Sequence, residues 1–433
     1  MQKKVLGAAM VGHTVESFDF VIYGYSAVII AKHFFPAENP ALAILSTLAV
    51  YGLAFVVRPL GGAVFGSIGD RLGRRTALST VVLIMAVATA AIGVLPTYGT
   101  AGIVAPILLL LCRTAQGLSM GAEYTSAASY VMEQAPPDRR GLWTSAVGSA
   151  TFIGAALASF LLLGLQSASS AAYQDWTWRL PFFIGGAMAL IGLYMRLRLS
   201  ESSTFRDLEE RGETTATPVR DSFRNTRSFL LLLAIFSLLA VVSQNFLGYL
   251  PTYLTTTAGL PSITVLVASG VALLICACLS VLTGAMSDRI GRRPLLIAGV
   301  VVAVLGSLPA YLIASIGSLW STIVALILLV VPSALVGMTA TITAVELVPP
   351  RIRATSTALT YNIAYAVFGG TAPLVGALLT TQFGRLAPGG YITVIAALAL
   401  VVVVVALPET HGRAQAVDPT ADAEPAPDPL PST

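Results

Sequence analysis

The chain has 433 residues, of which 56% are hydrophobic and only 11% are charged. Soluble domains are about 45–50% apolar and about 25% charged, so this composition excludes a water-soluble globular protein and indicates one that is integral to a membrane. The net charge of +4 is too small to indicate a nucleic-acid partner. The three cysteines lie in apolar runs, where neither a disulfide framework nor a metal site is expected.

A transmembrane helix needs about 20 mostly apolar residues. Twelve such runs follow one another, at 8–31, 43–69, 76–95, 104–132, 142–166, 179–199, 228–257, 262–287, 294–315, 319–346, 354–380 and 389–407. We therefore predict an all-α membrane protein with twelve transmembrane helices in two six-helix bundles. Its predicted parts are an N-terminal bundle (1–199), a cytoplasmic linker (200–227), a C-terminal bundle (228–407) and a disordered cytoplasmic tail (408–433).

The positive charges predict the orientation of these helices. Most of the 25 lysines and arginines fall on one side of the twelve-span topology, and that side also receives both termini and the linker. Only Lys32, Arg179 and Arg385 fall on the opposite side. Because loops rich in Lys and Arg stay in the cytoplasm, we predict a multi-pass protein of the cell inner (cytoplasmic) membrane with both termini cytoplasmic.

The first predicted span carries three ionisable side chains, in the stretch GHTVESFDFVIYGY at 12–25. At about 100° per residue, one stripe of about 120° on this helix holds His13, Glu16, Asp19 and Tyr23. A charge at the bilayer centre costs about 2.5–3.5 kcal/mol unless it faces a partner or a water-filled cavity. The stripe therefore predicts a helix face that lines a wet cavity. We interpret His13, near the predicted cytoplasmic end, as a polar contact rather than a proton relay.

A short motif occurs twice. GSIGDRLGRRTAL at 66–78, between spans 2 and 3, recurs as GAMSDRIGRRPLL at 284–296, between spans 8 and 9. Two related halves joined by a linker are typical of transporters, whose substrate site lies between the halves near the middle of the membrane.

The repeated turns are candidates for a conformational latch. An aspartate in such a turn can lie against a helix N-terminus or pair with an arginine of a neighbouring span. We predict that these contacts form when the two halves close on the cytoplasmic side. The candidate latch residues are Asp70, Arg71, Arg74, Arg75, Asp288, Arg289, Arg292 and Arg293. The alternative is an ordinary charged turn that only sets the topology.

The charged residues embedded within the spans lie in the first half, whereas Glu346 of the second half falls at a cytoplasmic end of its span. The embedded residues comprise three acids and two bases, namely Glu16, Asp19, Glu123, Arg58 and Arg113. Full pairing leaves one carboxylate over, and a buried carboxyl group without a cationic partner can hold a proton. We predict that this set couples transport to protons, with Asp19 near Arg58, and with Asp19 and Glu123 as the first choices for the proton carrier. The alternative is a static salt-bridge network that fixes how the helices meet.

Neutral polar residues mark the second half, where no ionisable residue falls near mid-depth. The candidate substrate-binding residues there are Gln244, Asn245, Tyr249, Tyr361 and Asn362, together with Tyr23, Arg113 and Gln116 of the first half. Since an arginine matches a carboxylate with paired donors, a substrate that bears a carboxylate is expected. Pro251 in span 7, and Gly369, Gly370 and Pro373 in span 11, are expected to distort their helices.

These motifs resemble those of a known family. The G-x-x-x-D-R-x-G-R-R turn and the R-x-x-Q-G of span 4 are similar to signatures of the major facilitator superfamily. The segments ESFDF, QGLSMGAEY and YNIAYAVFGGTAPL resemble its metabolite:proton symporter branch, which includes permeases for proline/betaine, citrate, α-ketoglutarate and shikimate. The resemblance implies alternating access driven by the proton gradient. His13 stands where Asn is common in that branch.

We therefore predict a proton-coupled symporter that imports a small organic acid or a zwitterion, acting as a monomer in the lipid bilayer. A proton antiporter that exports amphiphilic compounds is the main alternative. A membrane-embedded enzyme is less favoured, because three widely separated histidines offer no nucleophile–base pair or metal site. No cofactor is expected.

Overall fold

The structure is a computed structural model. It describes residues 2–36, 39–62, 64–65, 74–121, 131, 135–136, 139–197, 223, 225–348 and 353–411. The regular elements in these ranges are helices, and each of the twelve predicted spans overlaps at least one of them. The first half contains α1 (Gln2–Tyr25), α2 (Ala27–Phe34), α3 (Pro40–Val56), α5 (Arg74–Val94), α6 (Tyr98–Ala101), α7 (Val104–Met120), α9 (Arg140–Ala168), α10 (Ser170–Asp175), the 3-10 turn η2 (Thr177–Arg179) and α11 (Leu180–Leu197).

The second half contains α14 (Thr226–Gln244), the π-helical turn η3 (Asn245–Tyr249), α15 (Leu250–Thr256), α16 (Ser262–Ile290), α17 (Arg292–Ala314), α18 (Leu319–Leu347), α19 (Arg353–Ala364), the π-helical turn η4 (Tyr365–Gly369), α20 (Ala372–Phe383) and α21 (Ala387–Ala406). The predicted linker and tail fall outside the described residues, apart from 223, 225–227 and 408–411. The four-part division of the chain therefore stays a prediction.

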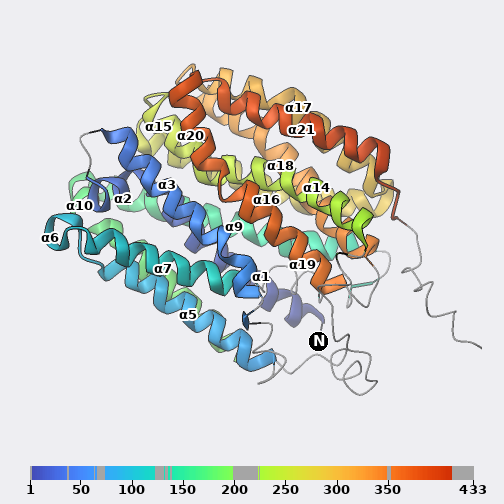
Figure 1. Cartoon of the computed structure of the whole chain (residues 1–433), viewed down its shortest axis with the longest axis horizontal. Helices are drawn as coiled ribbons and strands as arrows, with labels where there is room; N and C mark the ends of the chain where they lie inside the picture. The colour runs from blue at the N-terminus through green and yellow to red at the C-terminus, as the bar shows by residue number, and fades with distance from the viewer. Residues whose placement is uncertain are drawn as a thin grey trace, which may run out of the picture.

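Figure 1 shows the two halves as two groups of helices, with α5 and α7 on one outer side and α17 and α21 on the other. The helices α2, α6 and α10 gather at one end of the molecule, which we call the Trp178 end. The opposite end carries the start of α9 and the last turn of α16, and we call it the Asp288 end. The expected two-bundle helical fold is confirmed.

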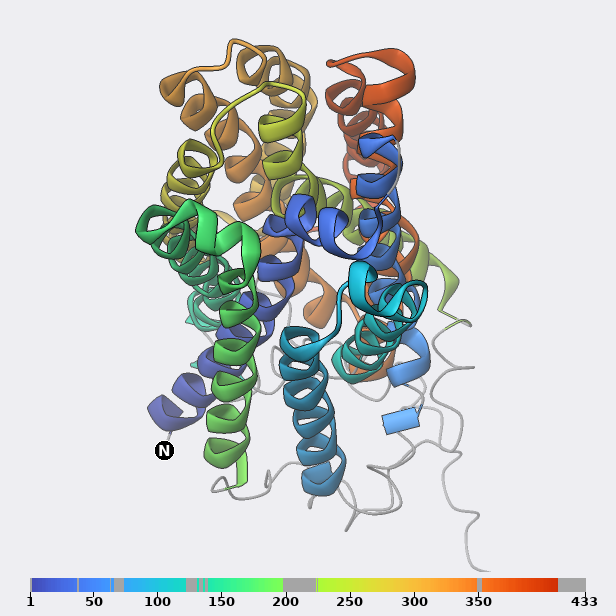
Figure 2. The ribbon, with the colours of Figure 1, turned by 90° about the vertical axis from the view of Figure 1, so that its left-hand side faces the viewer.

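Several pairs of helices join the halves. Two of them are α9 with α16, and α3 with α20, the latter pair lying side by side in Figure 2. Both pairs approach closely through glycines. A Cβ atom on Gly52 would lie 2.4 Å from the carbonyl oxygen of Gly370, and one on Gly284 would lie 2.4 Å from that of Gly141. Small residues at these positions let the helix backbones touch, as is common between membrane helices.

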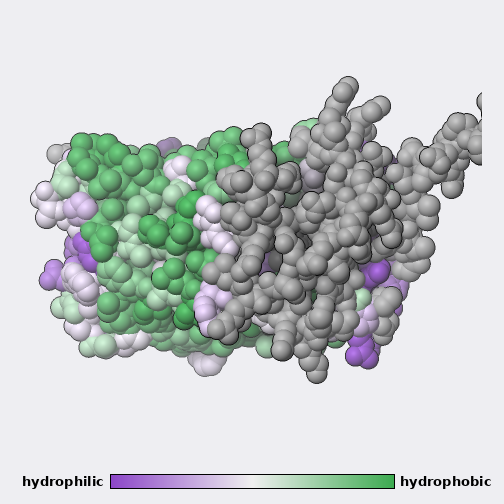
Figure 3. All heavy atoms as spheres, turned by 90° about the horizontal axis from the view of Figure 1, so that it is seen from below, coloured by the Kyte–Doolittle hydropathy of each residue, from purple (hydrophilic) through white to green (hydrophobic). Residues whose placement is uncertain are grey.

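The outer surface carries a broad apolar belt. Figure 3 shows hydrophobic residues covering much of the described surface in that view, with hydrophilic residues toward its left and right ends. Within the described residues, eight helices are long and apolar enough to cross a membrane, and α1 and α2 make a ninth if they form one span bent by 61°. This belt is the surface that a multi-pass protein presents to lipid.

Spans 7 and 11 are each interrupted by a π-helical turn. In span 7 the turn η3 comes just before Pro251, and in span 11 the turn η4 comes just before Pro373. The turns lie where these prolines, which lack a backbone donor, led us to expect distorted helices. Single π turns inside helices are frequent at functional sites, and η3 and η4 both contribute a side chain to the cavity described next.

Candidate functional site

A cavity of about 100 Å³ lies between the two halves. Helices of both halves line it, from α1, α3, α7 and α9 on one side to α14, α18 and α19 on the other. Its polar lining comprises His13, Glu16, Ser17, Tyr51, Arg58, Thr151, Ser243, Gln244, Ser333, Tyr361 and Tyr365. The predicted site between the halves therefore has a physical counterpart, formed by charged groups of the first half and neutral groups of the second.

Glu16 and His13 form the acidic part of this lining. The two side chains are three residues apart on α1, and His13 Nδ1 lies 3.5 Å from Glu16 Oε2. Both side chains are almost fully buried, with 3% of His13 and 8% of Glu16 exposed. A carboxylate and an imidazole at this distance form an ion pair only when the imidazole is protonated, so the charge of the pair depends on one proton.

The α1 helix turns its polar stripe only partly toward the cavity. Taking His13 as 0° and about 100° per residue, the lining residues of α1 occupy an arc from about 300° at Glu16 to about 80° at Val21. Asp19 at about 240° and Tyr23 at about 280° lie outside that arc. The predicted wet face therefore holds for His13 and Glu16, whereas the described cavity lining does not include Asp19 or Tyr23.

Arg58 is the cationic group of the cavity. It lies in the same membrane span as Tyr51 and Phe55, seven and three residues after them respectively, so all three side chains share one helix face. The guanidinium carbon of Arg58 lies 4.2 Å from the ring centre of Phe55 and 5.0 Å from that of Phe20, and Arg58 Nη2 contacts the sulfur of Met120 at 3.4 Å. Aromatic faces stabilise a buried guanidinium while they leave its edge available for hydrogen bonds.

Aromatic rings of the second half form the opposite wall. Tyr361 and Tyr365 stack with ring centres 4.3 Å apart, and Tyr365 stacks on Phe55 at 6.2 Å, so a row of rings crosses from one half to the other. Tyr51 donates a 2.7 Å hydrogen bond to Gln244, which also joins the halves. The cavity thus combines a cation, an acid and several aromatic faces within a small volume.

Asp19 and Arg113 belong to a second, separate cluster behind α1. Gln116 Nε2 donates to Asp19 Oδ2 at 2.7 Å and to Thr89 Oγ1 at 2.9 Å, while Gln116 Oε1 accepts from Arg113 Nη1 at 2.9 Å. The sequence predicts Asp19 near Arg58, and its hydrogen bond in this cluster is instead to Gln116, which bridges it to Arg113. Asp19 turns toward the helices of its own half because it projects about 120° away from His13 around α1.

Arg113 is covered by rings. Its guanidinium carbon lies 4.2 Å from the ring centre of Tyr23, 4.6 Å from that of Phe20 and 5.5 Å from that of Tyr51. Phe20 therefore stands between the two arginines and contacts both. Arg113 is fully buried and does not appear in the described lining of the cavity, so this aromatic layer separates it from the space where a substrate would bind.

The remaining candidates of the second half have structural contacts. Asn245 donates to the carbonyl of Val241 at 2.9 Å, and the Tyr249 hydroxyl contacts Thr380 at 2.6 Å. Asn362 Nδ2 donates to the Gly121 carbonyl at 2.7 Å and so ties span 11 to span 4. Of the predicted substrate-binding residues, Gln244 and Tyr361 line the cavity, and the described lining includes none of the others.

The sequence reasoning missed Tyr51 and Phe55 and left Tyr365 out of the predicted site. A usable signal exists for the first two, since Tyr51, Phe55 and Arg58 follow the i, i+4, i+7 spacing of one helix face. For Tyr365, the signal is its spacing of four residues from Tyr361. Glu123, a first choice for the proton carrier, lies outside the described residues.

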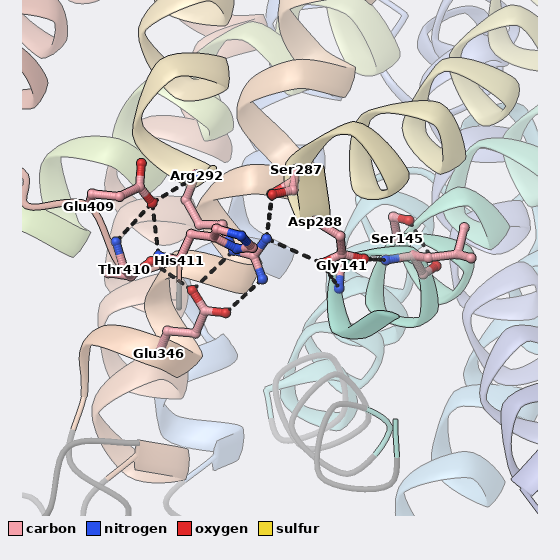
Figure 4. A network of polar contacts seen from close by, with 10 residues as sticks. Gly141, Ser145, Ser287, Asp288, Arg292, Glu346, Glu409, Thr410 and His411 are labelled. Carbon is pink, nitrogen blue, oxygen red and sulfur yellow. Dashed lines mark hydrogen bonds and ion pairs between the residues drawn. The ribbon is translucent and has the colours of Figure 1, made fainter. Parts of the chain in front are cut away.

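Asp288 joins the halves at the Asp288 end. Its two carboxylate oxygens accept the backbone N–H groups of Gly141 and Leu142, each at 2.9 Å, at the start of the 29-residue helix α9 (Figure 4). Asp288 belongs to the second half and α9 to the first. The free N–H groups and the dipole of a helix N-terminus attract a carboxylate, so this contact holds the two halves together.

Arg292 extends the contact into the second half. It lies 3.2 Å from Asp288 and binds both oxygens of Glu346 with distances of 2.8 and 3.2 Å (Figure 4). Arg293 donates to the Val404 carbonyl at 2.8 Å, and Arg289 is exposed. Asp70 and Arg71 lie outside the described residues, as do the side chains of Arg74 and Arg75.

The segment that follows α21 ends on the same network. The carboxylate of Glu409 accepts the backbone N–H groups of Arg292 and Arg293, at 2.9 and 3.1 Å, at the start of α17. It also accepts the N–H groups of Thr410 and His411. Burial raises the pKa of Glu409, but these four donors outweigh burial and hold the pKa below its usual range. Thr410 Oγ1 donates to Glu346 at 2.6 Å.

Comparisons with known proteins place this geometry in a family. A profile of the Major Facilitator Superfamily matches residues 9–372. The proline/betaine transporter of Escherichia coli (strain K12) is 32% identical over 416 residues, which cover 92% of this chain and 82% of that protein. The glycine betaine/proline/ectoine/pipecolic acid transporter OusA of Dickeya dadantii (strain 3937) is also 32% identical over 416 residues, which cover 92% of this chain and 82% of that protein.

A solved structure shares the fold. The proton:xylose symporter XylE, the xylose transporter of E. coli, superimposes with a TM-score of 0.77 over 96% of this chain and 97% of that one, at 17% sequence identity. At this identity, the likeness concerns the fold alone. The profile match and the relatives above 30% identity, both over most of the chain, carry the family assignment: the chain belongs to the Major Facilitator Superfamily.

Proposed function

We propose that this protein is a proton-coupled symporter that imports a small zwitterion, of the proline or betaine type, by alternating access. The observation that carries the proposal is the presence of Arg58 and Glu16 in one small cavity bounded by both halves. Arg58 can hold a carboxylate through paired donors, and Glu16 can exchange a proton. The relatives named above carry proline and betaine in their names, and both compounds combine a carboxylate with a nitrogen centre.

The aromatic wall supports a cationic end opposite that carboxylate. A quaternary or secondary ammonium is attracted to the faces of tyrosine rings, by about 0.5–2 kcal/mol for each contact. In this proposal the substrate carboxylate binds Arg58, and its nitrogen lies against Tyr361 and Tyr365. Gln244 and Ser243 also line the cavity and supply neutral hydrogen-bonding groups for the substrate.

The size of the cavity favours this substrate class over the main alternative. Pockets for drug-sized ligands have volumes of about 300–1,000 Å³, and this cavity has about 100 Å³. A small zwitterion therefore suits it better than an amphiphilic drug-like compound exported by an antiporter. The relatives are named as transporters, which supports transport rather than catalysis as the role of the chain.

Alternating access also needs contacts that form and break at each end. In this proposal the Asp288 end faces the cytoplasm together with both termini, and the contact of Asp288 with α9 closes that end. Substrate and proton release then require Asp288 to leave the N–H groups of Gly141 and Leu142. Because one chain contains both halves, it works as a monomer.

The direct test is uptake into proteoliposomes of labelled proline, glycine betaine, citrate and shikimate, with and without a pH gradient that is acidic outside. We expect gradient-driven accumulation of proline, glycine betaine or both. Arg58→Gln should weaken the apparent affinity at least about tenfold, because it removes the paired donors. The matched control is Arg385→Gln, because Arg385 is an exposed arginine outside the described cavity lining. Equal affinity in wild type and Arg58→Gln contradicts the proposed site.

A further inference from the structure

The cavity contains a titratable pair, His13 and Glu16, of which the proposed function uses only Glu16. His13 and Glu16 project from one face of α1 into the cavity, with His13 Nδ1 3.5 Å from Glu16 Oε2. An unperturbed imidazole exchanges its proton near pH 6.5, whereas an unperturbed glutamate does so near pH 4.3. A pair of this kind can therefore change its charge in the physiological range, which a carboxyl group in water does not.

The described residues that line the cavity around the pair include one fixed charge, that of Arg58. Among the described residues that line the cavity, the other ionisable groups are Arg58 from span 2 and the three tyrosines Tyr51, Tyr361 and Tyr365. The α9 helix, which packs closely along α1, contributes Gly148, Thr151 and Phe152, and α14 and α18 contribute uncharged residues. At neutral pH the tyrosines carry no charge, so the net charge of these described groups depends on whether His13 is protonated.

We propose that His13 and Glu16 together bind the transported proton, and that this proton sets the affinity of the cavity for the carboxylate of the substrate. The inference rests on the proposed function and names the group that couples the proton to the substrate. With His13 neutral, the pair carries one negative charge that opposes a carboxylate at Arg58. When a proton binds the imidazole, the pair becomes neutral overall and leaves the positive charge of Arg58 uncompensated.

In this arrangement, binding of the proton raises the affinity of the cavity for the substrate, and binding of the substrate raises its affinity for the proton. The proton arrives from the acidic side, binds an imidazole nitrogen, and leaves to the less acidic side after the halves rearrange, so no other reactant is needed. By thermodynamic linkage, a proton that tightens substrate binding is itself bound more tightly when substrate is present, by the same factor. Asp19, held by Gln116 outside the cavity, has no direct contact with a substrate in this arrangement.

The test is the dissociation constant of labelled proline for the purified protein at about pH 6 and about pH 8, an interval over which proline keeps its charge state. Wild type should bind at least about fivefold more tightly at the lower pH, within the usual range of coupling between two sites. His13→Asn should bind with less than about twofold difference. Glu16→Gln should bind at pH 8 as tightly as wild type at pH 6, because it removes the negative charge permanently.

His33→Asn is the matched control. His33 Nε2 donates a hydrogen bond to the Gln174 carbonyl, and its ring stacks on Trp178, outside the described cavity lining. This variant should keep the wild-type pH dependence. An unchanged pH dependence in His13→Asn overturns the inference.

A second measurement needs no variant. Adding proline to wild type in weakly buffered solution near pH 7 should remove protons from the solution, and no proton uptake also overturns the inference. If wild type accumulates proline in response to a pH gradient while either of these results contradicts the role of His13, only the inference fails. If wild type neither binds nor accumulates proline or glycine betaine, the proposed function fails.

Discussion

Gln116 donates a 2.7 Å hydrogen bond to Asp19 and accepts one of 2.9 Å from Arg113, so a neutral amide stands between an acid and a base of the first half. The same amide also donates to Thr89. All of its hydrogen-bonding groups are thus used within the first half. This cluster fixes how α1, α5 and α7 meet, while the cavity in front of it holds Glu16 and Arg58.

Replacing Gln116 should therefore damage stability before it affects substrate recognition. Gln116→Leu removes the donor to Asp19 and the acceptor of Arg113, and leaves two buried ionisable groups without their bridge. We expect a loss of about 2–5 kcal/mol, measured as reversible unfolding or as the thermal midpoint in detergent. Asp19→Asn is the control, since its amide oxygen still accepts from Gln116. If Gln116→Leu is as stable as Asp19→Asn, the bridge has no structural role.

The contact between Asp288 and α9 should control opening of the Asp288 end. We expect Asp288→Ala to raise the labelling rate of a cysteine placed at Ser333, in the cavity, by at least about tenfold, because two hydrogen bonds to a charged group are lost. The measurement uses a membrane-impermeant maleimide in a background without the native cysteines. Arg289→Ala, on the same turn but exposed, should leave the rate unchanged. Equal rates in both variants contradict the latch.

Glu409 should stabilise the fold in a pH-dependent way. Because its pKa is held below the ordinary value of 4.5 in the folded protein, its contribution is present at neutral pH and is lost as the pH falls from about 4.5 through the folded pKa. We expect Glu409→Gln to unfold at a lower temperature than wild type at pH 7, with the difference shrinking as the pH approaches about 3. A difference that stays constant over this interval contradicts the assignment.

The aromatic wall should select for the nitrogen end of the substrate. Removing one ring, as in Tyr361→Ala or Tyr365→Ala, should weaken glycine betaine binding by about five- to thirtyfold, the loss of roughly 1–2 kcal/mol of cation–π attraction. Tyr361→Phe and Tyr365→Phe keep the ring and should bind within about twofold of wild type. Equilibrium binding of labelled glycine betaine measures both. If the phenylalanine variants lose as much affinity as the alanine variants, the hydroxyl groups and not the ring faces hold the ligand.

The fold could be predicted from the sequence because it depends on features that are local and repeated. Apolar runs of membrane-spanning length predicted twelve spans, each of which overlaps a helix of the described residues, and the duplicated turn at 66–78 and 284–296 indicated two halves. The distortions of spans 7 and 11 could also be expected from Pro251 and Pro373. Each of these signals is confined to one segment of the chain, so no knowledge of helix contacts was needed.

The site was less predictable, because it depends on how each helix is rotated. A stripe of about 120° on α1 suggested one face that lines a wet cavity. Only the structure shows that the described cavity lining includes Glu16 but not Asp19. The contact between Glu409 and the start of α17 joins residues more than a hundred positions apart through backbone N–H groups. No pattern of side chains in the sequence indicates such a contact, so the sequence analysis assigned Glu409 to the predicted disordered tail.

Proton movement that accompanies substrate movement tests the central claim most directly. Proteoliposomes loaded with a fluorescent pH indicator and given no initial pH gradient should acidify inside when proline or glycine betaine is added outside. The acidification should be absent in His13→Asn, which lacks the imidazole that takes up the proton. Acidification in wild type and none in His13→Asn is the predicted result. Substrate entry without any change of internal pH in wild type contradicts proton-coupled symport through this cavity.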